Sequence, residues 1–169
     1  MPIVFRLLIL AFVAGLSPFT AAAQQAGSGA TVAFGSLKAD PTLPVEVTSD
    51  QLNVDQTAGT AIFTGNVVVI QGEMRLTAPV VQVDYAEDRR RIARLHATGG
   101  VTLVNAGEAA ESDEAVYTID TGNVVMTGNV LLTQGSSALS GNRLTVDLTQ
   151  GTGVMDGRVQ TVFLPGSAP

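Results

Sequence analysis

Short apolar segments, separated by glycine, asparagine and aspartate, run along most of this 169-residue chain. At 81–85 (VQVDY) and 144–148 (LTVDL), apolar and polar residues alternate, a period of two that places one row of side chains on an apolar interior and the other in solvent. Valine, threonine, leucine and isoleucine predominate and helical spacing is almost absent, which indicates an all-β chain. We predict strands at 45–47, 52–54, 67–70, 80–85, 101–104, 116–119, 130–133, 144–148 and 159–164.

The central part of the chain contains an internal repeat. With a shift of 63 residues, 49–85 aligns on 112–148 without a gap, and 12 of the 37 positions are identical. The identities include the segments TGNV (64–67 and 127–130) and QG (71–72 and 134–135). A gapless match of this quality predicts two copies of one β unit.

A shorter motif, glycine followed by any residue and then valine, gives a finer period. Copies at residues 65, 99, 128 and 157 are spaced by 34, 29 and 29 residues, and a further copy begins at residue 122. Glycine motifs at such nearly regular intervals are typical of stacked or rolled β architectures. We expect each of the four spaced glycines to adopt a positive φ at a corner between strands, and the asparagines that follow two of them to tolerate the left-handed region.

The two ends of the chain differ from the middle. Residues 1–23 carry Arg6, an apolar run at 7–16 and three alanines at 21–23, which is the pattern of a secretory signal peptide cleaved after Ala23. The run is shorter than the roughly 20 residues of a membrane-spanning helix. Residues 24–44 are expected to be a flexible leader with local order near 32–37, and 165–169 a disordered tail. The segment 45–164 is then the one folded domain.

Composition and charge exclude several classes of function. Nine basic residues stand against 15 acidic ones, a net charge of −6, which argues against nucleic-acid binding. The chain has no cysteine and one histidine, which argues against a zinc or iron–sulfur site. The carboxylates of Asp50/Asp113 and Asp84/Asp147 are related by the repeat, which favours a structural role over catalysis. We expect neither enzymatic activity nor a cofactor.

The two repeat copies resemble a known family. The segments 63–72 (FTGNVVVIQG) and 126–135 (MTGNVLLTQG) look like the TGNV…QG signature of the LptA/OstA-like family, and 45–50 and 76–83 also fit it. The resemblance covers roughly 45–164. It implies an open, slightly twisted antiparallel β-jellyroll with a V-shaped section, whose apolar interior receives the acyl chains of lipid A.

The resemblance also implies a location and partners. Members of the family act in the periplasm of Gram-negative bacteria, in outer-membrane assembly, and transport lipopolysaccharide. They associate head to tail by β-strand addition, and the resulting bridge joins the inner-membrane Lpt complex to the periplasmic domain of the outer-membrane translocon. An unclosed roll favours such oligomers on physical grounds, because its edge strands leave backbone donors and acceptors unpaired.

The apolar rows of the repeat supply candidate lipid-binding residues. They are aliphatic rather than aromatic, and acyl chains need apolar contact area more than directed polar groups. Each candidate can equally belong to the core that any β domain of this size requires. Those expected near the ends of the roll, Val45, Val47, Leu103, Tyr117 and Ile119, are the stronger candidates for lipid contact. The full set is Val45, Val47, Leu52, Val54, Phe63, Val67, Val69, Leu76, Val83, Leu103, Tyr117, Ile119, Met126, Val130, Leu132, Leu139 and Val146.

Arg89, Arg90, Arg91 and Arg94 form a basic cluster. Such a cluster can bind the lipid A phosphates or an acidic partner through charge-assisted hydrogen bonds. Because Glu87 and Asp88 precede it, a solvated hairpin tip is the favoured explanation.

Two other classes of function remain open on the sequence alone. One is a structural β-solenoid or adhesin-like scaffold that binds no lipid. The other is a short relative of the periplasmic domain of the outer-membrane translocon.

Overall fold

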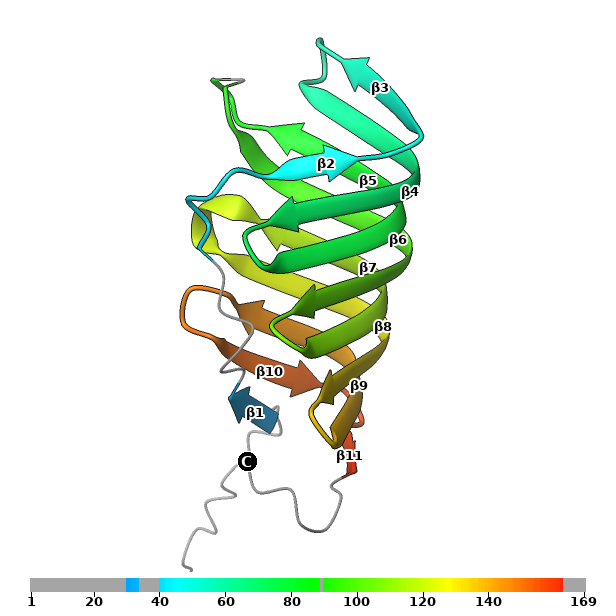
Figure 1. Cartoon of the computed structure of the whole chain (residues 1–169), viewed down its shortest axis with the longest axis vertical. Helices are drawn as coiled ribbons and strands as arrows, with labels where there is room; N and C mark the ends of the chain where they lie inside the picture. The colour runs from blue at the N-terminus through cyan, green and yellow to red at the C-terminus, as the bar shows by residue number, and fades with distance from the viewer. Residues whose placement is uncertain (1–29, 34–39, 89, 163–169) are drawn as a thin grey trace, which may run out of the picture.

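A computed structural model describes residues 30–33, 40–88 and 90–162, and the statements that follow concern these residues. They form one antiparallel sheet in the order β1-β10-β9-β8-β7-β6-β5-β4-β2, with β11 also paired to β9 and β3 to β4 (Figure 1). The expected all-β, unclosed fold is therefore confirmed. The strands are β1 (Ala30–Ala33), β2 (Glu46–Thr48), β3 (Gln51–Asp55), β4 (Thr60–Gln71), β5 (Met74–Tyr85), β6 (Ile92–Asn105), β7 (Glu108–Thr118), β8 (Asn123–Gln134), β9 (Ser137–Asp147), β10 (Thr152–Asp156) and β11 (Gln160–Val162), with a single 3₁₀ turn, η1 (Ile119–Thr121), after β7.

The sheet bends along one line because the register of neighbouring strands shifts at the same level in five successive pairs, from β4·β5 to β8·β9. A bulge inserts an extra residue into a strand and kinks it. Aligned bulges fold the sheet into two limbs that face each other (Figure 1). We call limb 1 the part built from 60–64, 80–85, 92–98, 114–118, 123–127 and 143–147, and limb 2 the part built from 67–71, 74–78, 101–105, 108–112, 130–134 and 137–141.

The two repeat copies have nearly the same backbone geometry at these bulges. Gly65 and Gly128 have φ of 79° and 80°, and the following Asn66 and Asn129 have φ of 46° and 45°. In each copy the asparagine Nδ2 donates a hydrogen bond of 2.8 Å to an aspartate Oδ2, that of Asp50 or of Asp113. The expected positive φ values and the structural role of this aspartate pair are thus confirmed.

The predicted strand boundaries were wrong at the bulges. Glycine and asparagine were expected to end strands at corners, but Gly65-Asn66, Gly99-Gly100 and Gly128-Asn129 lie inside β4, β6 and β8. Most predicted strands are therefore too short. Each corresponds to the part of an observed strand that lies in one limb, whereas the observed strand continues into the other limb. The strand predicted at 116–119 also ends one residue early, because Ile119 begins the 3₁₀ turn.

The sheet has two open edges. At the N-terminal edge, β3 pairs with limb 1 of β4 and β2 with limb 2. At the C-terminal edge, β10 pairs with limb 1 of β9 and β11 with limb 2, and β1 adds outside β10. β1 falls within the segment 24–44 that was expected to be a flexible leader. The predicted signal peptide, its cleavage after Ala23 and the predicted tail lie outside the described residues, and so do residues 163 and 164. In the described part of the chain, no helix is long and apolar enough to span a membrane.

Candidate functional site

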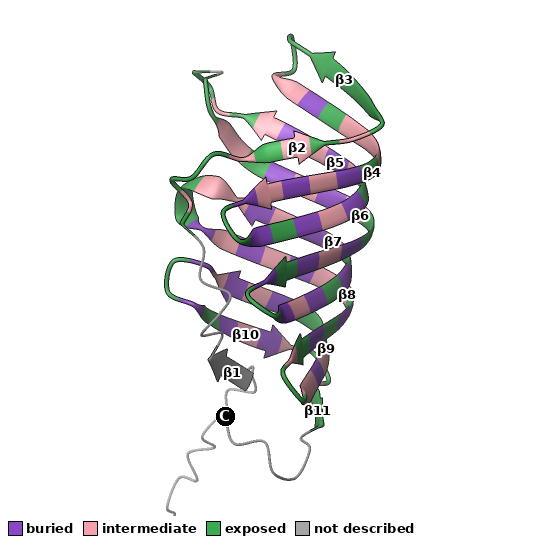
Figure 2. Cartoon of the chain, viewed as in Figure 1, coloured by how far each residue is buried: buried purple, intermediate pink, exposed green. Residues whose placement is uncertain are grey.

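The interior between the limbs is lined by one residue in two along each strand. Buried and less buried residues alternate along the sheet (Figure 2), and the buried apolar side chains form a single cluster. Across the strands these residues fall into continuous ladders, which we call the inward rows. Two rows of limb 1 are Leu52–Phe63–Val81–Ala97–Ala115–Met126–Leu144–Met155 and Val54–Ala61–Val83–Leu95–Tyr117–Val124–Val146–Gly153, and one row of limb 2 is Val47–Val69–Leu76–Leu103–Ala110–Leu132–Leu139.

The inward rows of limb 1 are covered at the C-terminal edge, where β1 lies outside β10, and exposed at the N-terminal edge. Met155 has no exposed surface, whereas Leu52 is 50% exposed and Val54 is 60% exposed. All five residues of β3 are exposed, although Leu52 and Val54 continue rows that are buried farther along. A partly solvated aliphatic end on an otherwise buried row is a candidate surface for an apolar ligand or for another sheet edge.

The predicted lipid-binding residues all lie on or against these rows. Leu52 and Val54 are the exposed ones, and Val45, Val47, Phe63 and Ile119 are partly buried and pack on the cluster. The others are buried in it, namely Val67, Val69, Leu76, Val83, Leu103, Tyr117, Met126, Val130, Leu132, Leu139 and Val146.

The expectation that Leu103 and Tyr117 lie near the ends of the roll was wrong. They lie on β6 and β7, in the middle of the strand order, and are 0% and 1% exposed. Local patterns do not reveal the order of the strands, because every segment carries the same alternation. Leu52 and Val54, at the N-terminal edge, are the exposed members of the predicted set.

A buried polar contact crosses the interior. Tyr117 Oη, from limb 1, donates a 2.7 Å hydrogen bond to Gln71 Oε1, from limb 2. Gln71 Nε2 donates in turn to the backbone oxygens of Pro41 (3.1 Å) and Leu43 (2.9 Å). This chain of bonds ties the two limbs together and fixes the segment that precedes β2.

Sequence reasoning missed the role of Gln71. The signal was present, because Gln71 and Gln134 are identical positions of the repeat, and Gln134 Nε2 also donates to a buried group, Glu108 Oε1, at 2.5 Å. Buried polar side chains in native structures are hydrogen-bonded. A repeated glutamine at the end of a strand, flanked by apolar rows, therefore indicates a polar contact inside the roll.

Replacing Tyr117 by phenylalanine is expected to lower the free energy of unfolding by about 1–2 kcal/mol, because Gln71 Oε1 loses its donor while staying buried. Tyr85→Phe is the matched control, since Tyr85 is 39% exposed, and should change stability by less than about 0.5 kcal/mol. Urea denaturation of both variants measures the difference. Equal effects would contradict a stabilising role for the Tyr117–Gln71 contact.

Tyr117 also predicts a pH dependence of stability. Burial raises the pKa of its phenol to about 12, from an ordinary value of about 10. The folded state therefore favours the neutral phenol, and this contribution is complete below about pH 10 and lost as the pH rises toward about 12. The stability difference between the natural protein and Tyr117→Phe should shrink over that interval, as measured by denaturation at each pH.

Two of the four arginines of the basic cluster, Arg91 and Arg94, are paired with neighbouring carboxylates. Arg91 contacts Asp120 and lies 3.7 Å from Asp88, and Arg94 Nη2 lies 2.6 Å from Asp84 Oδ2. Burial alone would raise the pKa of Asp84, but hydrogen bonds from Gln82 and Arg94 lower it below its usual value. Arg90 is exposed, and Arg89 lies outside the described residues.

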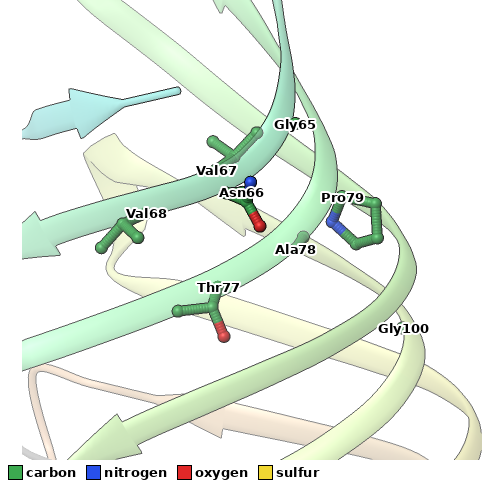
Figure 3. A pocket seen from close by; sticks show the side chains of 8 residues that line it. All are labelled: Gly65, Asn66, Val67, Val68, Thr77, Ala78, Pro79 and Gly100. Carbon is green, nitrogen blue, oxygen red and sulfur yellow. The ribbon is translucent and has the colours of Figure 1, made fainter. Parts of the chain in front are cut away.

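Two surface grooves accompany the bend and the N-terminal edge. One, of about 480 Å³, follows the line of bulges between Asn66, Thr77, Pro79 and Gly100 (Figure 3), where the Asn66 amide is already bonded to Asp50. The other, of about 320 Å³, lies at the N-terminal edge and includes Val54 and Tyr85. The second groove extends the exposed end of the inward rows. Among the described residues, no group of three or more histidines or carboxylates is placed to hold a metal ion.

The sequence profile of a family described as "LptA/(LptD N-terminal domain) LPS transport protein" matches residues 46–152, more than half of the chain. The chain belongs to this family. The match spans β2 to the first residue of β10, so the family's signature segments are the bulged strands described above. The expected family is therefore confirmed, and it is a family of transport proteins.

Individual relatives agree with the family. An uncharacterized protein of Rhizobium meliloti (strain 1021) is 27% identical over 96% of this chain and 94% of its own length. The lipopolysaccharide export system protein LptA of Escherichia coli (strain K12) is 26% identical over 69% of this chain and 66% of its own length. Among solved structures, LptH of Pseudomonas aeruginosa, described as the LptA-homologous periplasmic component of the lipopolysaccharide transport device, superposes with a TM-score of 0.68 at 19% identity. That match covers 75% of this chain and 99% of LptH, and it shows a shared fold.

Proposed function

We propose that this protein binds lipopolysaccharide in the periplasm and carries it from the inner to the outer membrane as one unit of a head-to-tail β-jellyroll bridge. The acyl chains of lipid A lie along the inward rows, and the sugar head group stays at the open side of the roll. No bond is made or broken in this function. Family membership supports the transport role, and the relative LptH of P. aeruginosa, which is described as a periplasmic component, supports the periplasmic location.

The observation that carries the proposal is the continuity of the inward rows from edge to edge. A row that begins exposed at Leu52 and stays apolar across the sheet offers an acyl chain an apolar environment at every strand. Each methylene that leaves water on such a surface contributes about 0.8 kcal/mol. Because the rows are packed together in the structure, we infer that chains enter by parting the limbs from the N-terminal edge.

The two edges support the assembly part of the proposal. β2 and β3 each pair only with β4 in the described part of the chain, so the outer side of the N-terminal edge has backbone groups for strand addition. A second copy, the inner-membrane Lpt complex and the periplasmic domain of the translocon are the partners assigned to these edges. Contact of Arg89, Arg90, Arg91 or Arg94 with the lipid head group or a partner stays a prediction.

Site-specific photo-crosslinking in Gram-negative cells tests lipid binding. A photoreactive residue at Leu52, on an inward row, is expected to yield an adduct with lipopolysaccharide. The same residue at Asn53, the next position of β3, is the matched control, because adjacent strand residues point to opposite faces. It should yield little or no lipid adduct.

The result also decides between classes of function. Absence of any lipid adduct at Leu52 and at Val47, in protein that is correctly folded, would refute lipid transport and favour the scaffold alternative. Equal adducts at Leu52 and Asn53 would show membrane or micelle contact without use of the inward rows, and would also count against the proposal.

A further inference from the structure

β1 occupies the limb 1 part of the C-terminal edge. It pairs antiparallel with β10 at four positions, Ala30 with Met155, Thr31 with Val154, Val32 with Gly153 and Ala33 with Thr152. Unpaired strand edges are templates for the addition of another strand. The part of the edge that β10 would offer to a partner is therefore already filled by the same chain. β11, on limb 2, pairs with β9 alone among the described strands.

β3 has the equivalent place at the opposite end of limb 1. Leu52 begins the inward row that ends at Met155, the partner of Ala30. Val54 begins the row that ends at Gly153, the partner of Val32. Both strands cross these two rows in the same order, so they run in the same direction relative to limb 1. A second copy that added its β3 to β10 would thus take the place of β1, with Leu52 at the position of Ala30 and Val54 at that of Val32.

Side-chain exposure differs between β10, which has β1 outside it, and β3, which has no strand outside it among the described residues. Met155, next to β1, is fully buried, whereas Leu52 and Val54 are 50% and 60% exposed. The rows are thus closed at the end where β1 is paired and open at the end that no strand covers.

We propose that β1 is an internal substitute for the β3 strand of a second copy, and that strand addition at the C-terminal edge requires β1 to leave β10. This inference rests on the head-to-tail association proposed above. Assembly is then a strand exchange. The outer edge of β10 stays hydrogen-bonded throughout, but its partner changes from β1 of the same chain to β3 of a second copy. The apparent dissociation constant is the intrinsic one divided by the fraction of chains whose β1 is detached.

A reversible disulfide lock tests the exchange directly. The chain has no cysteine, so Thr31→Cys with Val154→Cys introduces a single pair at cross-strand partners, whose Cα separation lies within the range of a disulfide. The oxidised protein is expected to stay monomeric in sedimentation velocity at concentrations where the reduced protein associates. Val125→Cys with Thr145→Cys, paired between β8 and β9 away from both edges, is the matched control and should associate equally in both redox states.

The opposite change should promote association. In Thr31→Pro/Val32→Pro, one of the two adjacent residues must lose a backbone donor to β10, because alternate residues of a strand bond to the same neighbour. If β1 is paired in nine of ten chains, the variant should associate at about tenfold lower concentration. A synthetic peptide of residues 28–35 should reverse the gain and restore hydrogen-exchange protection at 153–155.

Each contrary result has a definite meaning. Equal association of the locked and reduced proteins would overturn the exchange but leave head-to-tail association standing. A proline variant that never associates, although its β10 amides exchange freely, would overturn the exchange together with self-association at this edge. Neither result bears on lipopolysaccharide binding, which the Leu52 adduct tests separately.

Discussion

The double substitution Leu52→Asp/Val54→Asp is expected to reduce lipopolysaccharide affinity by about a hundredfold or more while leaving the fold intact. Full burial of a valine or leucine side chain contributes about 1.5–3 kcal/mol, and roughly half of this is left for lipid contact at each position because the side chains are already partly buried. These two losses, together with the cost of desolvating two carboxylates against acyl chains, reach the roughly 2.7 kcal/mol that corresponds to a factor of one hundred. Because both side chains are at least half exposed in the free protein, the free energy of unfolding should change little. Binding of a fluorescent lipopolysaccharide, together with urea denaturation, measures the two effects.

The control places the same charges on the other face of the same strand. Gln51→Asp/Asn53→Asp adds two aspartates to β3, where all five residues are exposed, but leaves the inward positions unchanged. It should retain most of the affinity, with a loss no greater than about threefold from general repulsion. If both double variants lose affinity equally, the effect is electrostatic and the inward rows do not carry the lipid.

The sequence was sufficient for the fold because its two strongest patterns are local. Alternation in segments such as 144–148 identifies strands whatever their neighbours, and the gapless repeat requires equivalent structure at Gly65 and Gly128. Strand length was not predictable in the same way. Gly65-Asn66 has the same residues as a turn between two strands, and only pairing with the next strand decides that the chain continues through it as a bulge.

The candidate site was predictable in composition but not in position. Alternation identified which side chains lie on the inward rows, and all the proposed residues except Leu52 and Val54 belong to the buried apolar cluster or pack against it. Which of them are accessible depends on strand order and on edges, since Leu52 and Leu103 have the same local pattern but opposite exposure. The pairing of β1 with β10 could not be predicted from local sequence patterns either, because it joins segments that are more than 100 residues apart.

The bend of the sheet depends on glycine at the bulges, and Gly128→Ala is expected to lower the free energy of unfolding by about 2–4 kcal/mol. Gly128 has φ of +80°, which costs a residue with a side chain about 1–2 kcal/mol. A Cβ there would also lie within 2.9 Å of the Asp113 side chain. Asp113 would have to move, and its hydrogen bond from Asn129 would be lost at a further cost of about 1 kcal/mol.

Gly135→Ala separates backbone strain from this clash. Gly135 also has a positive φ, +55°, but no atom lies within 4 Å of the position of its Cβ. It should therefore lose only about 1 kcal/mol. Gly65→Ala, at the equivalent bulge of the first repeat, should match Gly128→Ala, because Asp50 stands against Gly65 as Asp113 stands against Gly128.

A double-mutant cycle shows whether the aspartate is the cause. If the clash is responsible, Asp113→Ala should destabilise the natural protein but partly rescue Gly128→Ala, so the two effects will not add. Additive effects, or equal losses for Gly128→Ala and Gly135→Ala, would mean that the aspartate–asparagine contact does not hold the bulge. Because all the aligned bulges lie on one line, the loss at a single bulge should also change how the limbs face each other. We therefore expect Gly128→Ala to bind lipopolysaccharide more weakly than Gly135→Ala even at temperatures where both are folded.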